Sequence, residues 1–156
     1  GASIIGDSDA ADFARDERVH ARLSEEWQRA LGRHIGTWRQ GSTRELQRTV
    51  KALHDAGVDI LAGADASTPQ IGGMAHGASL HHELALLVGA GLSPVEALRA
   101  ATSVPARRFK LPDRGRIAGG CRADLLLVEG DPTLNIRDTL SIRGVWRQGV
   151  LLEEAR

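Results

Sequence analysis

The sequence predicts an α/β fold followed by a small β unit, on three observations. Up to residue 111, amphipathic helical patterns alternate with a short apolar run, as in helices packed on parallel strands. From residue 112 onward, the apolar pattern becomes extended and glycines interrupt it. The length of 156 residues suits one ordinary domain, well short of the roughly 250 residues of a complete (β/α)8 barrel. We therefore expect two units, residues 1–111 and 112–156.

The composition excludes several classes of protein. With 42% hydrophobic and 26% charged residues, it is typical of a globular chain, and the formal net charge is zero. The chain therefore lacks the positive excess with which proteins hold nucleic acid or anionic membranes, and no apolar run is long enough to span a bilayer. Cys121 is the single cysteine, so there is no internal disulfide. We expect a cytoplasmic protein without nucleic-acid or membrane partners.

The N-terminal third carries a strand tail and two helical patterns. Residues 3–6 suit the end of a strand that enters a loop. One long amphipathic helix is predicted over residues 12–35, where apolar residues recur every four positions at Val19, Leu23, Trp27 and Leu31. Residues 42–45 form a capping-box pattern, so a second helix begins there and ends before Gly57.

The middle of the chain predicts a parallel strand, a functional loop and two helices. Residues 58–65 are short, apolar and follow a helix directly, as a parallel strand does. The polar, Gly-rich stretch 66–78 is longer than most connections, and loops of that length usually have a function. Ser79 is expected to cap the next helix, which closes at Gly91. Residues 93–96 combine an N-cap, a proline and a capping-box glutamate, which predicts a helix running toward residue 105 or 109.

The last unit is predicted to be extended. Residues 123–128 indicate a buried strand that stops at the turn 130–132. Residues 142–147 and 150–152 indicate two more strands, joined through Gln148-Gly149 as a β-hairpin.

Asp65 is the first candidate for chemistry. A carboxylate that closes a parallel strand faces the edge where α/β enzymes keep their active sites, so Asp65 could bind a metal, accept a proton from water, or both. An aspartate that caps the following turn through Ser67 or Thr68 is an equally good interpretation. His76, in the loop, is a candidate substrate contact with a structural role as the alternative.

Other motifs point away from specific chemistries. His82-Glu83 begins the helical zinc-protease pattern, but its fifth position is Leu86, so that site is excluded. For the helical His81 and His82, packing or solvent exposure is favoured over metal binding. Residues 115–120 imitate a phosphate loop without its Lys-Ser/Thr end and are interpreted as a turn.

Four segments follow one another in an order that is specific as a set: Gly57–Asp65, Ser79–Leu84, Gly91–Thr102 and Gly115–Leu125. Together they resemble the C-terminal part of metal-dependent amidohydrolases, most closely the imidazolonepropionase-like and prolidase-like branch. The resemblance covers about residues 42–152, whereas residues 1–41 match loosely. It implies the C-terminal portion of a (β/α)8 TIM-type barrel, in which residues 58–65 are the eighth strand, plus part of a small β-sandwich domain.

The resemblance also implies a role for Asp65. In that family the aspartate closing the last strand contacts a divalent metal, here expected to be one or two zinc ions, and accepts a proton from the attacking water. The implied substrate is a small-molecule amide or cyclic amide, or a dipeptide-like amide. Ala64 and Cys121 stand where many relatives have threonine and lysine, and neither position is a metal ligand. The family's His-x-His pair and its other ligands are not in this chain, and one carboxylate does not hold a catalytic metal.

Two hypotheses of different classes follow. The first is a fragment of a hydrolase acting on carbon–nitrogen bonds, inactive until an N-terminal barrel half complements it. The alternative is a non-catalytic α/β interaction module that associates through exposed barrel edges with another chain or as a homo-oligomer. Because the chain begins with Gly1 rather than Met, a processed product, an engineered terminus and a partial reading frame all stay open. An upstream frame with a His-x-His strand favours the enzyme, and a start codon close to Gly1 favours the module.

Overall fold

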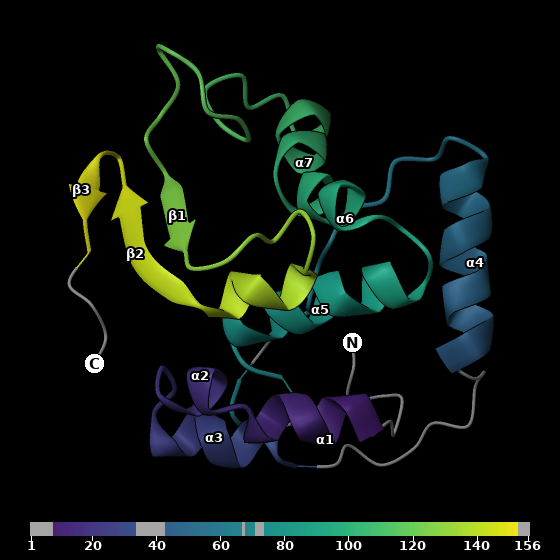
Figure 1. Cartoon of the computed structure of the whole chain (residues 1–156), viewed down its shortest axis with the longest axis vertical. Coiled ribbons are helices and arrows are strands. Elements are labelled where there is room, and N and C mark those ends of the chain that lie inside the picture. The colour runs from purple at the N-terminus through teal and green to yellow at the C-terminus, as the bar shows by residue number, and fades with distance from the viewer. Residues whose placement is uncertain (1–7, 34–42, 67, 71–73, 153–156) are drawn as a thin grey trace.

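The computed structural model describes residues 8–33, 43–66, 68–70 and 74–152 (Figure 1). Within these ranges the elements are α1 (Ser8–Arg15), α2 (Glu17–His20), α3 (Glu25–Leu31), α4 (Thr43–Asp55), α5 (Ala78–Gly89), α6 (Pro94–Ala101), α7 (Ser103–Arg108), β1 (Leu125–Val128), the 3-10 helix η2 (Ile136–Leu140), β2 (Ile142–Arg147) and β3 (Val150–Leu151). Helices with one small sheet fit the predicted partial α/β fold. None of the described helices has the length and apolarity needed to cross a membrane. The strand tail predicted at residues 3–6 lies outside the described residues.

Helix α5 is the centre of the molecule. It contacts α4, α6 and η2, and Figure 1 shows it running between the N-terminal helices and the pair α6–α7. The main core consists of buried aliphatic side chains from α5, α6 and η2 and from the α5–α6 connection: Leu84, Leu87, Leu92, Ala97, Ala100 and Ile136. Burial of each large aliphatic side chain contributes about 1.5–3 kcal/mol, so this cluster is the main source of stability for the helical part.

The helix ends follow the predicted capping chemistry. Gly57 and Gly91 adopt φ values of +78° and +103° after α4 and α5, as predicted for residues that end helices. At α6, the Ser93 side chain accepts a hydrogen bond from the Glu96 N–H at 3.2 Å, and the Glu96 carboxylate accepts one from the Ser93 N–H at 2.7 Å. With Pro94 in the first turn, this is the predicted capping box, and it is confirmed.

The prediction of one helix over residues 12–35 is wrong. The chain forms α1, α2 and α3 instead, since Asp16 leaves the helix and its carboxylate accepts the Arg18 N–H at 2.9 Å to cap α2. A short polar side chain that bonds its own backbone competes with helix continuation. The apolar stripe still finds a core, because Val19 and Leu31 pack with Phe13, Ala75 and Leu140.

The predicted parallel strand over residues 58–65 is not formed among the described residues. The Ala62 N–H donates to the Ala100 carbonyl of α6 at 2.9 Å, and Ile60 and Ala62 pack partly against the main core. A parallel strand requires parallel neighbours, whereas the sheet in the described part is antiparallel. The barrel arrangement of this segment therefore rests on the family resemblance and not on strand pairing.

Two further helix boundaries differ from the prediction. Ser79 does not cap α5, because the helix starts at Ala78 and the buried Ser79 hydroxyl accepts the Ala75 N–H at 2.9 Å. The helix predicted to run to residue 105 or 109 is divided into α6 and α7. The division lies at Thr102, whose φ of −130° and ψ of −84° leave the helical region.

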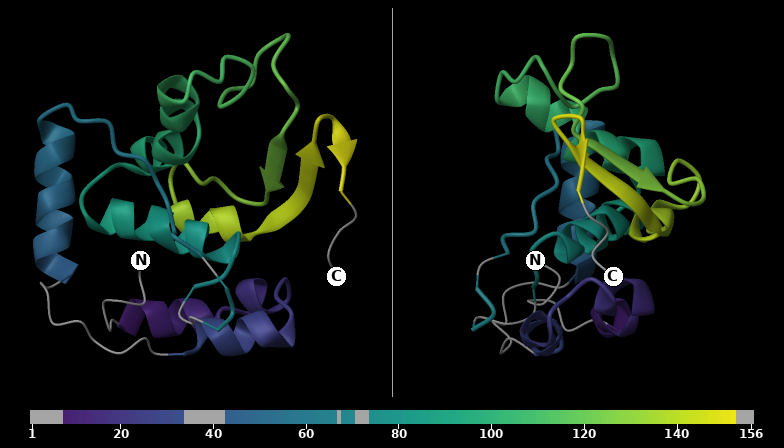
Figure 2. Two further views of the ribbon diagram at one scale, coloured as in Figure 1. Left: turned by 180° about the vertical axis from the view of Figure 1, so that it is seen from behind. Right: turned by 90° about the vertical axis from the view of Figure 1, so that its left-hand side faces the viewer.

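The small sheet has the strand order β1-β2-β3, with both pairs antiparallel. Gln148 and Gly149 have φ values of +55° and +80°, which the two central residues of a type I′ hairpin require, so the predicted hairpin is confirmed. The prediction that β1 is buried is wrong, because Leu125, Leu126 and Leu127 are 37%, 48% and 53% exposed. Figure 2 shows β2 leaving the end of η2 and carrying the sheet away from the helices, so the described chain leaves these side chains uncovered.

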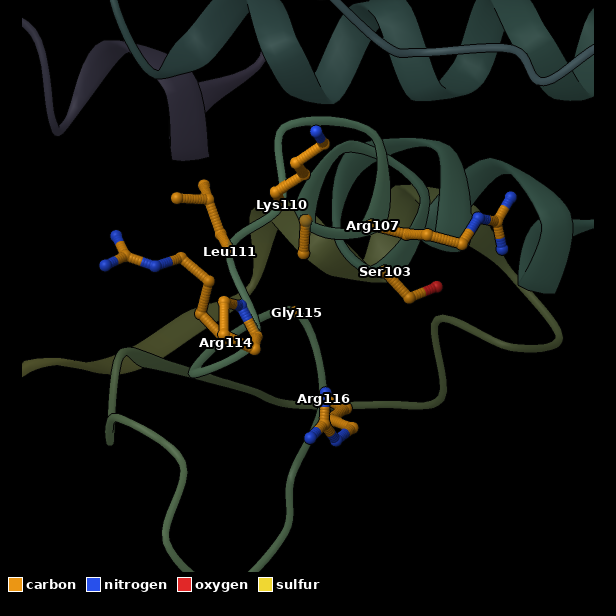
Figure 3. Close-up of a pocket in the computed structure, with 9 residues that line it drawn as sticks. Ser103, Arg107, Lys110, Leu111, Arg114, Gly115 and Arg116 are labelled. Atoms are coloured by element: carbon orange, nitrogen blue, oxygen red, sulfur yellow. The ribbon is translucent and has the colours of Figure 1, made fainter.

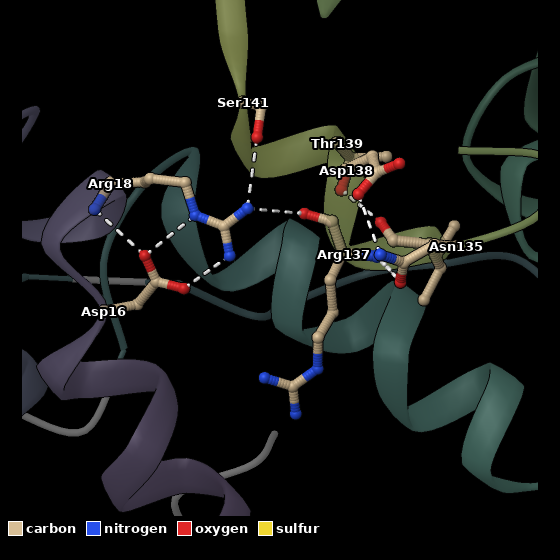
Figure 4. A network of polar contacts seen from close by, with 8 residues as sticks. Asp16, Arg18, Asn135, Arg137, Asp138, Thr139 and Ser141 are labelled. Atoms are coloured by element: carbon tan, nitrogen blue, oxygen red, sulfur yellow. Dashed lines mark hydrogen bonds and ion pairs between the residues drawn. The ribbon is translucent and has the colours of Figure 1, made fainter. Parts of the chain in front are cut away.

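Helix α2 is attached to the C-terminal segment through Arg18 (Figure 4). Its guanidinium donates to the Arg137 carbonyl at 3.3 Å and to the Ser141 hydroxyl at 3.1 Å. The Asp16 carboxylate accepts from the same guanidinium at 3.0 and 2.7 Å and so fixes its orientation. Residues more than a hundred positions apart are thereby joined.

Candidate functional site

Asp65 lies at the end of the segment that follows α4. Its side chain is exposed and its backbone has a φ of +49°, in the left-handed region that aspartate tolerates better than most residues. Within the described ranges its carboxylate makes no hydrogen bond or ion pair, and none is seen with Thr68; Ser67 lies outside these ranges. An unpaired carboxylate on a constrained backbone is available to a ligand.

His76 stands at the turn that leads into α5. It is exposed, and its ring meets the Trp27 ring of α3 edge-on, with centroids 5.2 Å apart and planes at 75°. No described contact joins His76 to Asp65. The structure therefore places both predicted residues at the surface and does not bring them together as a pair.

The helical histidines pack, as the sequence favoured for them. His82 is buried with its ring centroid 4.9 Å from that of Phe13. Burial lowers the pKa of the neighbouring His81, whose Nδ1 is buried without a hydrogen-bond partner in the described part of the chain. Burial also raises the pKa of Glu83 on the same helix. The ring contact of His82 with Phe13 joins α5 to α1, and the described residues do not combine these three groups into a metal-ligand set.

A complete metal site is not found among the described residues: no three His, Cys, Asp or Glu side chains lie close enough to hold an ion together. Zinc in proteins takes at least three protein ligands. Asp65 supplies one carboxylate, so the described residues do not fit a metal centre by themselves.

In the part of the chain that the structure describes, pockets are found away from Asp65 and His76, and three of them are relevant. One of about 300 Å³ is bordered by His54, Asp59 and Glu96. Another of about 480 Å³ lies at the end of α7 (Figure 3), and an apolar one of about 600 Å³ adjoins it between α6–α7 and β1. Neither Asp65 nor His76 lines any of these three pockets.

Asp59 makes an ion-pair contact with α7 that the sequence analysis did not predict. Its carboxylate accepts from Arg107 at 2.7 and 2.8 Å and also from Arg108 of the same helix. The hydrogen bond from Arg107 is the main reason that the pKa of Asp59 lies below its usual range. The signal in the sequence was an acidic residue inside an otherwise apolar segment, which needs a cationic partner when it faces another element.

Comparison with known proteins gives the chain a family. The sequence model described as "Amidohydrolase family" matches residues 13–152, which is most of the chain. The chain belongs to the amidohydrolase family. The resemblance predicted from the four motifs is thereby confirmed.

Individual members of the amidohydrolase family support the same branch. An imidazolonepropionase of Nocardia farcinica is 34% identical over 113 residues, covering 70% of this chain and 28% of that protein. An adenine deaminase of Geobacillus kaustophilus is 30% identical over 137 residues, covering 83% of this chain and 23% of that protein. The structure of a Xaa-Pro dipeptidase with bound methionine in its active site superposes with a TM-score of 0.61 and 28% identity, over 69% of this chain and 25% of that one. The chain thus spans about a quarter of the length of these relatives.

Proposed function

We propose that this chain is part of a hydrolase that cleaves carbon–nitrogen bonds in small molecules, acting on an amide, a cyclic amide or a dipeptide-like amide. The observation that carries the proposal is membership of the amidohydrolase family over residues 13–152. The names of the relatives, a deaminase and a dipeptidase among them, support the bond type. They do not select one substrate.

Asp65 is the proposed catalytic residue. Its exposed carboxylate, without a partner among the described residues, would accept the proton of the water that attacks the substrate carbon. We further propose that Asp65 is one ligand of a divalent metal, expected to be zinc, whose remaining ligands lie beyond the described residues. His76, exposed beside Trp27, is the proposed substrate contact.

The organisation proposed for the chain is a partial barrel over residues 1–111 and part of a β-sandwich over residues 112–156. The change from helices to an antiparallel sheet after α7 supports this division, and so do the exposed leucines of β1, which suit one layer of a sandwich. With a single carboxylate ligand, the chain alone is expected to be inactive. It would require a complementing N-terminal barrel half.

The test compares two aspartate variants in the protein expressed from the complete reading frame that contains these residues. Asp65→Asn removes the proton acceptor, and we expect turnover to fall by about 10²–10⁴-fold. Asp55→Asn is the matched control, because Asp55 pairs with Lys51 on the surface of α4 and is expected to leave turnover unchanged.

The readout is release of ammonia or amine from N-acyl amino acids, Xaa-Pro dipeptides and aminopurines, and ring opening of cyclic amides, with metal content measured in parallel. Normal turnover by the Asp65→Asn protein would refute the assignment of Asp65. Hydrolysis by the 156-residue chain alone would refute the need for complementation.

One observation favours a second candidate function, that of a non-catalytic interaction module. The sheet exposes apolar side chains on both outer strands of the described part, at Leu126 and Leu127 of β1 and Val150 and Leu151 of β3. Light scattering after size exclusion discriminates the two candidates. A stable homo-oligomer of this chain, with no hydrolysis by the protein from the complete reading frame, would favour the module.

A further inference from the structure

A tight turn fixes the backbone of His76 just before α5. Gly77 has φ and ψ values of +74° and −63°, and the Ala78 N–H donates across it to the His76 carbonyl at 2.9 Å. These dihedral angles and this hydrogen bond define a γ-turn of the rare, strained form, which glycine tolerates because it has no Cβ. A strained turn that presents an exposed histidine is an observation from which function can be inferred.

The residue before His76 is anchored in the core of the N-terminal helices. Ala75 is 0% exposed and packs in a buried cluster to which α1, α2 and α3 each contribute a side chain. Its N–H donates to the Ser79 hydroxyl at 2.9 Å, and the Ser79 N–H donates to its carbonyl at 3.0 Å. Figure 1 shows the segment that enters α5 extending toward the layer formed by α1 and α3. The backbone that carries His76 is therefore held against the N-terminal helices.

Trp27 holds the exposed side chain of His76 from one side. It lies on α3 one turn before the buried Leu31, and it packs partly against the same cluster as Ala75. The two rings are 5.2 Å apart between centroids and inclined at 75°, a favourable geometry for an aromatic pair. Such a pair changes an equilibrium constant by about two- to tenfold beyond the effect of buried area. Among the described residues, no hydrogen bond or ion pair competes for the imidazole.

We propose that Trp27 is a positioning residue of the hydrolytic site, through which the N-terminal helices take part in substrate binding. The inference rests on the proposed function, in which His76 contacts the substrate. A side chain that is already held in one orientation loses less rotamer freedom on binding than a free one, so Trp27 strengthens the contact made by His76. Binding of this kind is shared by the ground state and the transition state, and its loss raises KM while kcat stays unchanged.

The first test is nuclear magnetic resonance of the 156-residue chain, which needs neither substrate nor metal. His76→Ala identifies the imidazole resonances of His76. We expect Overhauser effects between these imidazole protons and the indole protons of Trp27. The nearby aromatic ring also displaces the imidazole resonances, so Trp27→Leu should move them to the positions of free histidine. Trp27→Phe keeps an aromatic ring and should retain most of the displacement.

Trp146→Leu is the matched control for this test. The Trp146 ring packs over Gly144 within the small sheet, so its loss should leave the His76 resonances unchanged. The absence of Overhauser effects between His76 and Trp27 in the parent protein would overturn the proposal, and this result does not depend on whether any variant folds.

The second test measures KM and kcat in the protein expressed from the complete reading frame. The substrate is the fastest-hydrolysed compound among the N-acyl amino acids, Xaa-Pro dipeptides, cyclic amides and aminopurines. We expect Trp27→Leu to raise KM about two- to tenfold and to leave kcat within about twofold, and Trp27→Phe to restore most of the loss. When His76 is already alanine, Trp27→Leu should have no further effect on KM, because the side chain that it positions is absent.

The kinetic outcomes separate this proposal from the proposed function. An unchanged KM in Trp27→Leu, or a rise of the same size when His76 is alanine, would overturn the positioning role. If turnover still depends on Asp65 in either case, the proposed function stands without it. If none of the compounds is hydrolysed, the proposed function fails and the positioning role fails with it, whatever orientation the Overhauser effects report for the imidazole.

Discussion

The attachment of α2 through Arg18 allows a quantitative prediction. Arg18→Met keeps the length of the side chain but removes the hydrogen bonds to the Arg137 carbonyl and the Ser141 hydroxyl, each of which contributes about 0.5–1.5 kcal/mol. The pair with Asp16 adds about 0.5 kcal/mol after allowance for solvent, because the two side chains are 39% and 17% exposed. We therefore expect the free energy of unfolding to fall by about 2 kcal/mol and the midpoint of thermal unfolding to fall by about 4–8 °C.

Urea unfolding followed by circular dichroism measures this change, and Arg15→Met is the matched control. Arg15 pairs with Asp12 at 3.4 Å, but both side chains are largely exposed, so its loss is expected to cost less than about 0.5 kcal/mol. If the two variants lose the same stability, Arg18 does not attach α2 to the C-terminal segment. A cycle with Ser141→Ala tests the same contact, with an expected coupling of about 0.5–1 kcal/mol.

The effect of Arg18→Met is expected to depend on pH. The hydrogen bond from Arg18 holds the pKa of Asp16 below its ordinary value of 3.8. A carboxyl with a lowered pKa stabilises the folded state above that ordinary value, and the contribution is lost as the pH falls through the lowered pKa. The difference in stability between the parent protein and Arg18→Met should therefore shrink below pH 3.8.

Two further predictions concern helix α5 and helix α6. Burial lowers the pKa of His81 from its ordinary value of 6.5. The stability contributed by the neutral His81 is therefore complete above pH 6.5 and is lost as the pH falls through the lowered pKa. His81→Leu should remove this part of the pH dependence of the free energy of unfolding in urea titrations, and an unchanged pH profile would contradict the prediction. Ser93→Ala removes the cap that accepts the Glu96 N–H and should cost about 1 kcal/mol, measured by thermal unfolding. Thr49→Ala, at an exposed position within α4, is its control, and a loss as large as that of Ser93→Ala would contradict the capping argument.

Features that depend on a few neighbouring residues could be predicted from the sequence. The capping box at Ser93 and the hairpin turn at Gln148-Gly149 each depend on local backbone preference, and both were found as predicted. The position of Ser79 illustrates the limit of such reasoning. The Ser79 hydroxyl accepts a hydrogen bond from the Ala75 N–H, which precedes α5. Residue type alone does not distinguish a serine that makes this contact from a serine that caps the helix.

Features that depend on distant partners could not be predicted in the same way. Asp16 ends a helix that periodicity alone would continue, and Arg18, which it orients, bonds to atoms more than a hundred residues away. The role of Asp59 required knowledge that α7 brings Arg107 and Arg108 beside it. Lys110 resembles any exposed lysine in the sequence, because its left-handed backbone is visible only in the structure.

The uncovered apolar surfaces connect the fold to the proposed function. The core residues around α5 and α6 are buried, whereas α4 has no buried residue and leaves Leu46 and Leu53 exposed. The segment 58–65 comes directly after α4, and its Val58 and Leu61 are exposed as well. In a barrel, an outer helix and its strand bury their apolar side chains against neighbouring strands. When those neighbours are absent, both elements leave apolar side chains exposed, as α4 and the segment 58–65 do. A homo-oligomer would cover the same surfaces, and hydrogen exchange of the Val58–Asp65 amides distinguishes it from a barrel. Protection of these amides that depends on chain concentration indicates self-association. Protection that is found only in the protein from the complete reading frame indicates a barrel.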